Sequence, residues 1–304
     1  MELRHLRYFV AVADERNITK AAVRLFMAQP PLSRQIQQLE EELGTLLIEK
    51  GSRPLRLTEA GEFFNVHARA VLAAAADLKS MTQRVGKIER TLSIGFVASI
   101  LYGLMPEVVR RFQADHPEVA ITFHEMTTMM QIQALKEGRI DVGFGRIKSE
   151  DPAIRRITLR EERLIVALPV GHRLAADGPP LKLRQLLGET LLVYPKAPRP
   201  SFADQVLAVF SERGMHPQNI VEVRELQIAI GLAAAGQGIT IVPDSLHGLK
   251  RGDVVYRDLD EPHALTPVIF SVRLMDQTEE LRHMLATIYA TYDAMGVSYN
   301  KEEL

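Results

Sequence analysis

The stretch TKAAVRLFMAQPPLSRQIQQLE, residues 19–40, decides the fold of the N-terminal part of the chain. Residues 19–26 form an amphipathic pattern with paired alanines, the small side chains that two helices need where they cross closely. After a break at residues 27–30, apolar side chains return at helical spacing. They are Leu32, Ile36, Leu39 and Leu43. Two short helices separated by so tight a break predict a helix-turn-helix.

The face of the second helix opposite this apolar stripe is polar. It carries Ser33, Arg34, Gln37 and Gln38. Such side chains hydrogen bond to base edges and phosphates in a major groove. Pro30 and Pro31 fit the first turn of a helix, where a missing N–H costs little. The pattern favours DNA binding, and an ordinary helical hairpin packed against another element is the alternative.

A basic hairpin is predicted immediately after these helices. The segments 46–50 and 55–57 flank the turn at 51–54, and the tip carries Lys50 and Arg53. A basic tip beside a recognition helix can reach the sugar-phosphate edge or the minor groove. A solvated turn with no partner is the alternative.

Residues 59–90 predict one long helix after the N-cap Thr58. Its apolar positions, interrupted by His67, include Phe64, Val71, Ala74, Leu78, Met81 and Val85. About 30 residues at roughly 1.5 Å each would span about 45 Å, which is too long for an ordinary helix within a domain. We therefore expect a linker helix that pairs with its twin in a homodimer. A helix packed along its own domain is the alternative.

Beyond residue 90, strands and helices alternate, which indicates an α/β fold. Strands are predicted at 92–97, 119–126, 140–144, 163–168, 190–194, 220–223, 239–242 and 267–273. Helices are predicted at 104–114, 129–137, 202–213, 225–235 and 279–295. The domains expected are therefore 1–58 for DNA binding, 59–90 as the linker, and 91–304 for a ligand.

Hydroxyl and cationic side chains stand where the predicted strands end. Ser99, Thr128 and Arg146 follow three strands, and Ser201 precedes a helix. Ligands of open α/β sheets bind beyond the carboxyl ends of the strands, and helix N-termini bind anions. We therefore expect a small carboxylate ligand. One such ligand is a dicarboxylate whose two carboxylates are held by opposite sides of a cleft. The alternative is that the hydroxyls only cap helices.

Composition excludes some functions. The 304 residues have a formal net charge of −1, and residues 1–58 hold nine Lys/Arg against seven Asp/Glu, so DNA affinity depends on a few placed cations. The absence of cysteine excludes disulfides and thiolate metal sites. No apolar run reaches membrane-spanning length and no signal peptide is evident, so we expect a cytoplasmic protein.

Two other classes of protein are less consistent with the sequence. The nine histidines include no i,i+4 metal pair, Ser99 has no neighbouring base, and residues 236–238 precede a strand where a phosphate-binding glycine motif would follow one. We therefore expect no enzyme. A solute-binding protein would explain the C-terminal part but leaves the first 90 residues without a purpose.

Several segments resemble the LysR-type transcriptional regulators. They are LRYFVAVA at 6–13, TKAA at 19–22, QPPLSRQI at 29–36 and LTEAG at 57–61. Further segments at 140–146, 151–154 and 233–236 look like the BenM/CatM branch of that family. The resemblance implies control of aromatic-compound catabolism in response to cis,cis-muconate and, in some members, benzoate, with no other cofactor.

The resemblance also implies an architecture. It comprises a winged helix-turn-helix, a linker helix, and a periplasmic-binding-protein-like domain of two Rossmann-like subdomains, residues 91–161 with 268–304 and residues 162–267. The expected partners are double-stranded operator DNA, RNA polymerase, and three further copies of the chain in a dimer of dimers. Ligand-driven closure of the subdomains would change the angle between dimers and bend the DNA.

Site residues carry over by matching position. The DNA contacts implied are Gln29, Pro30, Ser33, Arg34 and Arg53. The effector contacts implied are Ser99, Thr128, Arg146, Pro200, Ser201 and Phe202. A second, benzoate pocket near Arg160 and Glu162 is conceivable, but its aromatic partner aligns cleanly with neither Tyr289 nor Tyr292. The alternative for Arg160 and Glu162 is a surface ion pair.

Overall fold

A computed structural model describes residues 1–49, 51–52, 54–85, 90–249 and 251–304 of the chain. The chain divides into two compact units, Met1–Gly86 and Lys87–Leu304. Within the described residues, no helix combines the length and apolar character needed to cross a bilayer.

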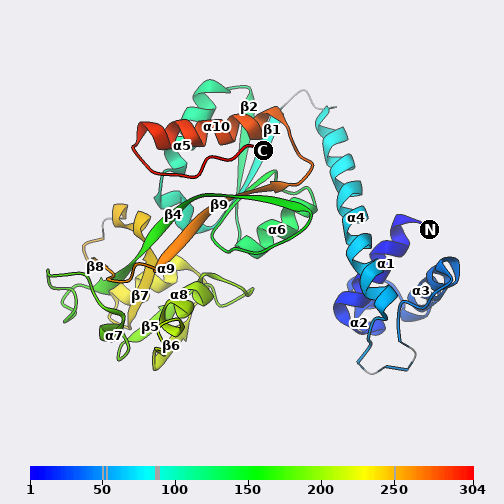
Figure 1. Ribbon diagram of the computed structural model, residues 1–304, viewed down its shortest axis with the longest axis horizontal. Helices are drawn as coiled ribbons and strands as arrows, with labels where there is room; N and C mark the ends of the chain where they lie inside the picture. The colour runs from blue at the N-terminus through cyan, green and yellow to red at the C-terminus, as the bar shows by residue number, and fades with distance from the viewer. Residues whose placement is uncertain (50, 53, 86–89, 250) are drawn as a thin grey trace. The chain divides into compact units, whose positions relative to one another are not determined.

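The first unit is helical. Its helices are α1 (Leu3–Glu15), α2 (Ile18–Arg24), α3 (Gln29–Leu43) and α4 (Glu59–Val85) (Figure 1). The predicted helix pair is α2 and α3, and α1 was not predicted. Helix α3 begins at Gln29, inside the expected break, because its prolines occupy the first turn after the extended residue Ala28. The paired Ala21 and Ala22 are buried in the core formed by these helices, as close helix crossing requires.

In the predicted hairpin after α3, the described residues form an antiparallel bridge between Ile48 and Leu57 and no strand of regular length. Glu40 of α3 holds the first segment of this hairpin, because the carboxylate accepts hydrogen bonds from the amides of Leu47 at 2.7 Å and Ile48 at 3.0 Å. The two basic tip residues, Lys50 and Arg53, lie outside the described residues.

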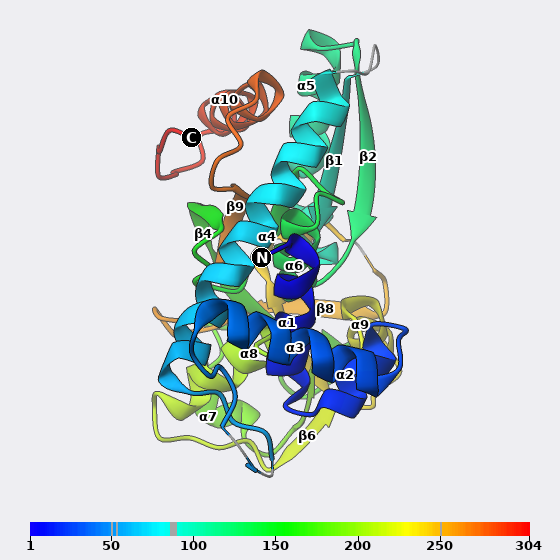
Figure 2. The same ribbon diagram turned by 90° about the vertical axis from the view of Figure 1, so that its right-hand side faces the viewer.

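The second unit is built on a mixed sheet. Its strands are β1 (Arg90–Phe96), β2 (Val119–Glu125), β3 (Val142–Gly145), β4 (Ile154–Pro169), β5 (Thr190–Val193), β6 (Asn219–Glu222), β7 (Ile239–Pro243), β8 (Val254–Asp258) and β9 (Leu265–Arg273). The order is β2-β1-β3-β9-β4-β7-β5-β6, and β8 pairs with β4. Figure 2 shows β1 beside β2, which are parallel neighbours. The predicted strands are confirmed, except that β4 is longer than expected and β8 was missed.

Helices cover the sheet. They are the 3-10 helix η1 (Ala98–Tyr102), α5 (Met105–Asp115), α6 (Thr128–Lys136), α7 (Leu183–Leu186), α8 (Phe202–Ser211), α9 (Leu226–Ala234), the 3-10 helix η2 (Asp244–Gly248) and α10 (Glu279–Ala294). One apolar core contains side chains of β1, β3, α5 and α10, and another contains those of β5, β7, α8 and α9. The unit therefore has two halves.

Two long antiparallel strands, β4 and β9, run through both halves of the second unit. Their register shifts between Thr158 and Arg160, and β4 passes from one core to the other between Leu159 and Leu164. Strand β4 spans 16 residues, of which the sequence pattern predicted only 163–168. In its first part, buried apolar residues are interspersed with charged residues. A continuous apolar run therefore begins only where both faces of the strand are covered.

Candidate functional site

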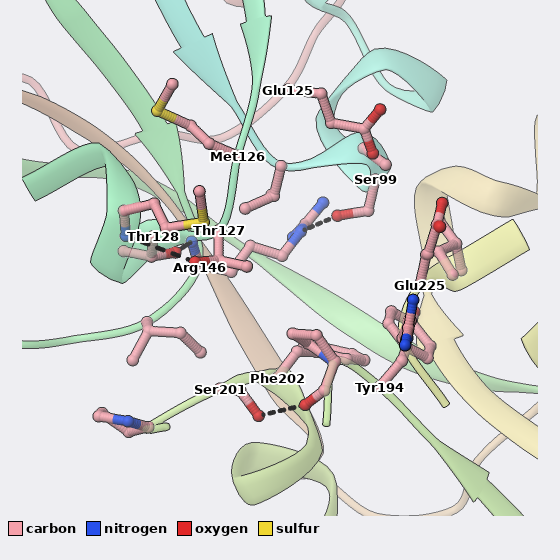
Figure 3. Close-up of a pocket in the computed structure, with 18 residues that line it drawn as sticks. Ser99, Glu125, Met126, Thr127, Thr128, Arg146, Tyr194, Ser201, Phe202 and Glu225 are labelled. Atoms are coloured by element: carbon pink, nitrogen blue, oxygen red, sulfur yellow. Dashed lines mark hydrogen bonds between the residues drawn. The ribbon is translucent and has the colours of Figure 1, made fainter. Parts of the chain in front are cut away.

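A cavity of about 370 Å³ opens at the carboxyl ends of β1, β2, β3 and β5. All six residues expected to contact an effector line it: Ser99, Thr128, Arg146, Pro200, Ser201 and Phe202. In Figure 3, Ser99, Thr128 and Arg146 lie on one side of the cavity and Ser201 and Phe202 on the other. The two sides belong to the two halves of the unit. The volume is within the usual range for small-molecule sites.

Arg146 organises the first side of the cavity. Its Nε donates to Ser99 Oγ at 2.7 Å, and its backbone N–H donates to Thr128 Oγ1 at 3.2 Å. Both hydroxyls therefore accept from Arg146, and neither donates to an acceptor within the described residues. Each retains an O–H that can donate to a ligand. Arg146 Nη1 is also buried and has no hydrogen-bond partner among the described residues.

Ser201 on the second side offers less than the sequence suggested. Its Oγ donates to the Pro195 oxygen at 2.9 Å, and its N–H donates to Asp204 Oδ2 at 2.6 Å. Both hydrogens are therefore used inside the protein, the N–H in the capping box of α8 and the hydroxyl in the preceding loop. A helix leaves its first-turn amides without internal partners, which applies to the N–H groups of Phe202 and Ala203; of these two residues, Phe202 lines the cavity. The helix-capping alternative describes Ser201 well. The Thr128 hydroxyl is not a helix cap, because the N-cap residue of α6 is Thr127.

A buried ion cluster lies behind Arg146. Glu162 pairs with Arg146, with 2.5 Å between Oε2 and Nη2, and also with Arg160. The Glu162 and Arg160 side chains are 3% and 14% exposed, so the interpretation of a surface ion pair is wrong. Burial by itself raises the pKa of Glu162, but the two guanidinium groups outweigh it and hold that pKa below its ordinary value.

The aromatic partner of this cluster is Tyr292 of α10. The Arg160 guanidinium carbon lies 5.6 Å from the centroid of the Tyr292 ring. A second cavity touches Arg160, Glu162 and Tyr292, but its volume is about 20 Å³. That volume holds about one water molecule, so a benzoate would have to displace surrounding side chains to enter.

Sequence reasoning missed several residues that line the main cavity. They are chiefly Glu125, Tyr194, Arg224 and Glu225. Tyr194 ends the predicted strand 190–194, so the strand-end rule that selected Ser99 could have found it. Burial raises the pKa of Tyr194, which keeps its hydroxyl protonated. Glu162 carried no comparable signal, because nothing local in the sequence places it against Arg146.

The expected DNA-reading face lies on α3. Gln29 Nε2 donates to Ser33 Oγ at 3.2 Å, so these two side chains pair with each other in the free protein. Arg34 is exposed and makes no ion pair among the described residues. Arg24 of α2 differs, because it binds Asp14 at 2.9 Å and is held there. Arg53, expected in the wing, lies outside the described residues.

The exposed side of α4 differs in part from the predicted seam. Val71, Ala74 and Leu78 are exposed, Leu78 to 69%. Phe64 instead packs on Phe9 of α1, with 5.1 Å between ring centroids. Its neighbours Phe63 and Val66, which the pattern did not select, are apolar and exposed, Phe63 to 68% and Val66 to 57%. The side chains of Met81 and Val85 lie outside the described part of the chain.

Comparison with known proteins agrees with this arrangement. Residues 3–62 match the bacterial regulatory helix-turn-helix proteins of the lysR family, and residues 86–290 match the LysR substrate binding domain. The fold thus defines a regulatory helix-turn-helix protein with a ligand-binding domain. The chain belongs to the LysR family of transcriptional regulators. Since that family consists of regulators, the chain is a regulator and not an enzyme.

Individual relatives cover nearly the whole chain. The HTH-type transcriptional regulator BenM of Acinetobacter baylyi is 47% identical over 97% of this chain and 98% of its own. The effector binding domain of BenM with its effector benzoate superposes with a TM-score of 0.66 and 41% identity, over 72% of this chain and 99% of that one. Full-length CbnR complexed with its target DNA superposes with a TM-score of 0.61 and 30% identity, over 96% of this chain and 100% of that one.

Proposed function

We propose that this regulator controls genes of aromatic-compound breakdown in response to a small carboxylate, with cis,cis-muconate as the principal candidate. The observation that carries the proposal is the polarity of the first cavity wall. Arg146 donates to the Ser99 and Thr128 hydroxyls, which leaves their own hydrogens free to donate to a ligand. Donors without acceptors suit a carboxylate oxygen. The similarity to BenM, which is solved with benzoate, agrees in ligand class.

Charge supports the same ligand class. The buried cluster contains the cations Arg146 and Arg160 and the anion Glu162, which leaves one positive charge in excess. An anion in the cavity would balance it. The amides of Phe202 and Ala203, at the positive end of α8, would receive the second carboxylate of a dicarboxylate on the opposite wall. A benzoate pocket beside Tyr292 is the weaker proposal, because that cavity has water size.

We propose DNA contacts from Gln29, Pro30, Ser33 and Arg34 in the major groove, and from Arg53 in the wing. The exposed guanidinium of Arg34 supports this assignment, as does CbnR, which has been solved with its target DNA. The protein would act as a dimer of dimers in the cytoplasm and contact RNA polymerase. Domains 1–58, 59–90 and 91–304 remain our proposed divisions.

Isothermal titration calorimetry of the full-length protein with cis,cis-muconate tests the ligand. We expect saturable binding, and binding that is weaker by roughly ten- to hundredfold in Ser99→Ala, because a lost hydrogen bond to a charged oxygen costs about 1.5–3 kcal/mol. Retention of operator DNA binding by the variant is the control. Absence of muconate binding by the wild-type protein would reject this effector while leaving the family assignment unchanged.

A further inference from the structure

Gln205 lies one turn after Ser201 in α8 and uses both ends of its side-chain amide. Its Nε2 donates to the backbone oxygen of Arg146 at 2.8 Å, and its Oε1 accepts from the Thr266 hydroxyl at 3.0 Å. Thr266 is fully buried on β9 and lies opposite Glu162 of β4 in the strand register. Gln205 therefore joins α8 to the backbone of Arg146 and to β9, the strand that pairs with β4 at Glu162.

This link crosses between the two halves of the unit. The hydroxyl donors of the cavity belong to the first half, whereas the free amides at the start of α8 belong to the second. In the part of the chain that the structure describes, no other α8 side chain hydrogen bonds to Arg146 or to β9. An amide with its donor and acceptor both engaged has one orientation, so Gln205 sets how far α8 lies from Arg146.

We propose that Gln205 is a positioning residue for the effector. It holds the first turn of α8 at the separation from Arg146 at which donors of both walls reach one ligand. The identity of that ligand rests on the proposed function above. A ligand that engages both walls depends on this separation. If the walls were not already held in place, part of the binding free energy would be lost in ordering them. A ligand that engages one wall does not.

Calorimetry of the full-length protein with two matched ligands tests the proposal. The ligands are cis,cis-muconate and (2Z,4Z)-hexa-2,4-dienoate, which has a methyl group in place of one carboxylate. We expect Gln205→Met to weaken muconate binding about tenfold and the monocarboxylate by less than about threefold. Gln113→Met, an exposed glutamine of α5, is the control and should change neither.

Thr266 separates a positioning role from a general loss of structure. Thr266→Val removes the hydroxyl that orients Gln205 and should give the same ligand-selective loss, whereas Thr266→Ser keeps the hydroxyl and should restore wild-type binding. Equal losses for both ligands in Gln205→Met, or no loss for either, would overturn the proposal.

A measurement without ligand distinguishes failure of this inference from failure of the effector assignment. If the wild-type protein binds neither ligand, the assignment of muconate as effector is wrong. The role of Gln205 is then decided by amide hydrogen exchange of the free protein. We expect residues 206–209 of α8 to exchange about tenfold faster in Gln205→Met than in Gln113→Met. Equal exchange rates would reject the positioning role.

Discussion

Arg146 Nη2 lies 2.5 Å from Glu162 Oε2, and each of the two side chains is only 3% exposed. The same carboxylate also pairs with Arg160, so two buried cations share a single buried anion and one positive charge is left in excess. Arg146 in turn organises both hydroxyls of the cavity and receives the Gln205 amide. The packing of the unit and the chemistry of its ligand site therefore meet in one ion pair.

Glu162→Gln should destabilise the second unit by about 3 kcal/mol, because it leaves two buried guanidinium groups without an anion. Denaturant unfolding followed by tyrosine circular dichroism measures this, since six of the seven tyrosines lie in that unit. The control is Glu161→Gln, at the exposed residue next to Glu162. It should change the free energy of unfolding by less than about 0.5 kcal/mol. Similar values for both variants would contradict the role assigned to the cluster.

The same pair predicts a pH dependence. Although burial favours a raised pKa, Arg146 and Arg160 hold the pKa of Glu162 below 4.5. A lowered pKa in the folded state stabilises the protein fully above the unfolded value, and this stabilisation is lost as the pH falls through the folded value. The stability difference between wild type and Glu162→Gln should thus be constant between about pH 6 and 8 and shrink below about 4.5. A difference that already shrinks from pH 8 to 6 would disprove this.

Gly145→Ala should displace Thr128 from the cavity. A Cβ at Gly145 would lie 2.7 Å from Thr128 Oγ1 and 2.8 Å from Cγ2, so the threonine side chain must move. We expect muconate affinity to fall about tenfold with operator affinity unchanged. Gly231→Ala in α9 is a matched control, because its Cβ meets nothing within 4 Å. Wild-type muconate affinity in Gly145→Ala would remove Thr128 from the site.

Two substitutions on α4 should have opposite effects. Leu78→Glu places a charge on an exposed apolar position and should lower the mass measured by light scattering if α4 pairs with its twin. Phe64→Ala removes the packing on Phe9 and should instead cost roughly 3 kcal/mol of stability in the first unit, with the mass unchanged. An unchanged mass in Leu78→Glu would rule out the predicted dimer seam.

Arg34→Ala should cost about 1–3 kcal/mol in operator binding and less on random DNA, if Arg34 reads a base. Arg24→Ala is the comparison, since Arg24 is occupied by Asp14 and Glu15. Arg24→Ala should change the affinity for operator DNA and the affinity for random DNA to the same extent. Fluorescence anisotropy at fixed salt measures both variants. Equal losses on operator and random DNA for Arg34→Ala would make it a phosphate contact.

Local patterns carried much of the fold. Leu32, Ile36 and Leu39 repeat at the helical period and are buried in α3, and the strand ends placed Ser99, Thr128 and Arg146 around one cavity. The first part of β4 and the short β8 were missed, because half-covered or edge strands do not form apolar runs. Period alone also could not distinguish Phe64, which faces its own domain, from the exposed Phe63.

The sequence by itself determined most of the helices and strands, the helix pair suited to DNA, and the residue types at the strand ends, because periodicity and turn chemistry act over a few neighbours. Only the tertiary structure decided that Glu162 is buried between Arg146 and Arg160 and that Gln205 joins Arg146 to Thr266. These contacts connect residues up to 61 positions apart in the chain. Their partners are selected by the crossing of β4 and β9 and by the exclusion of water, which no local pattern encodes.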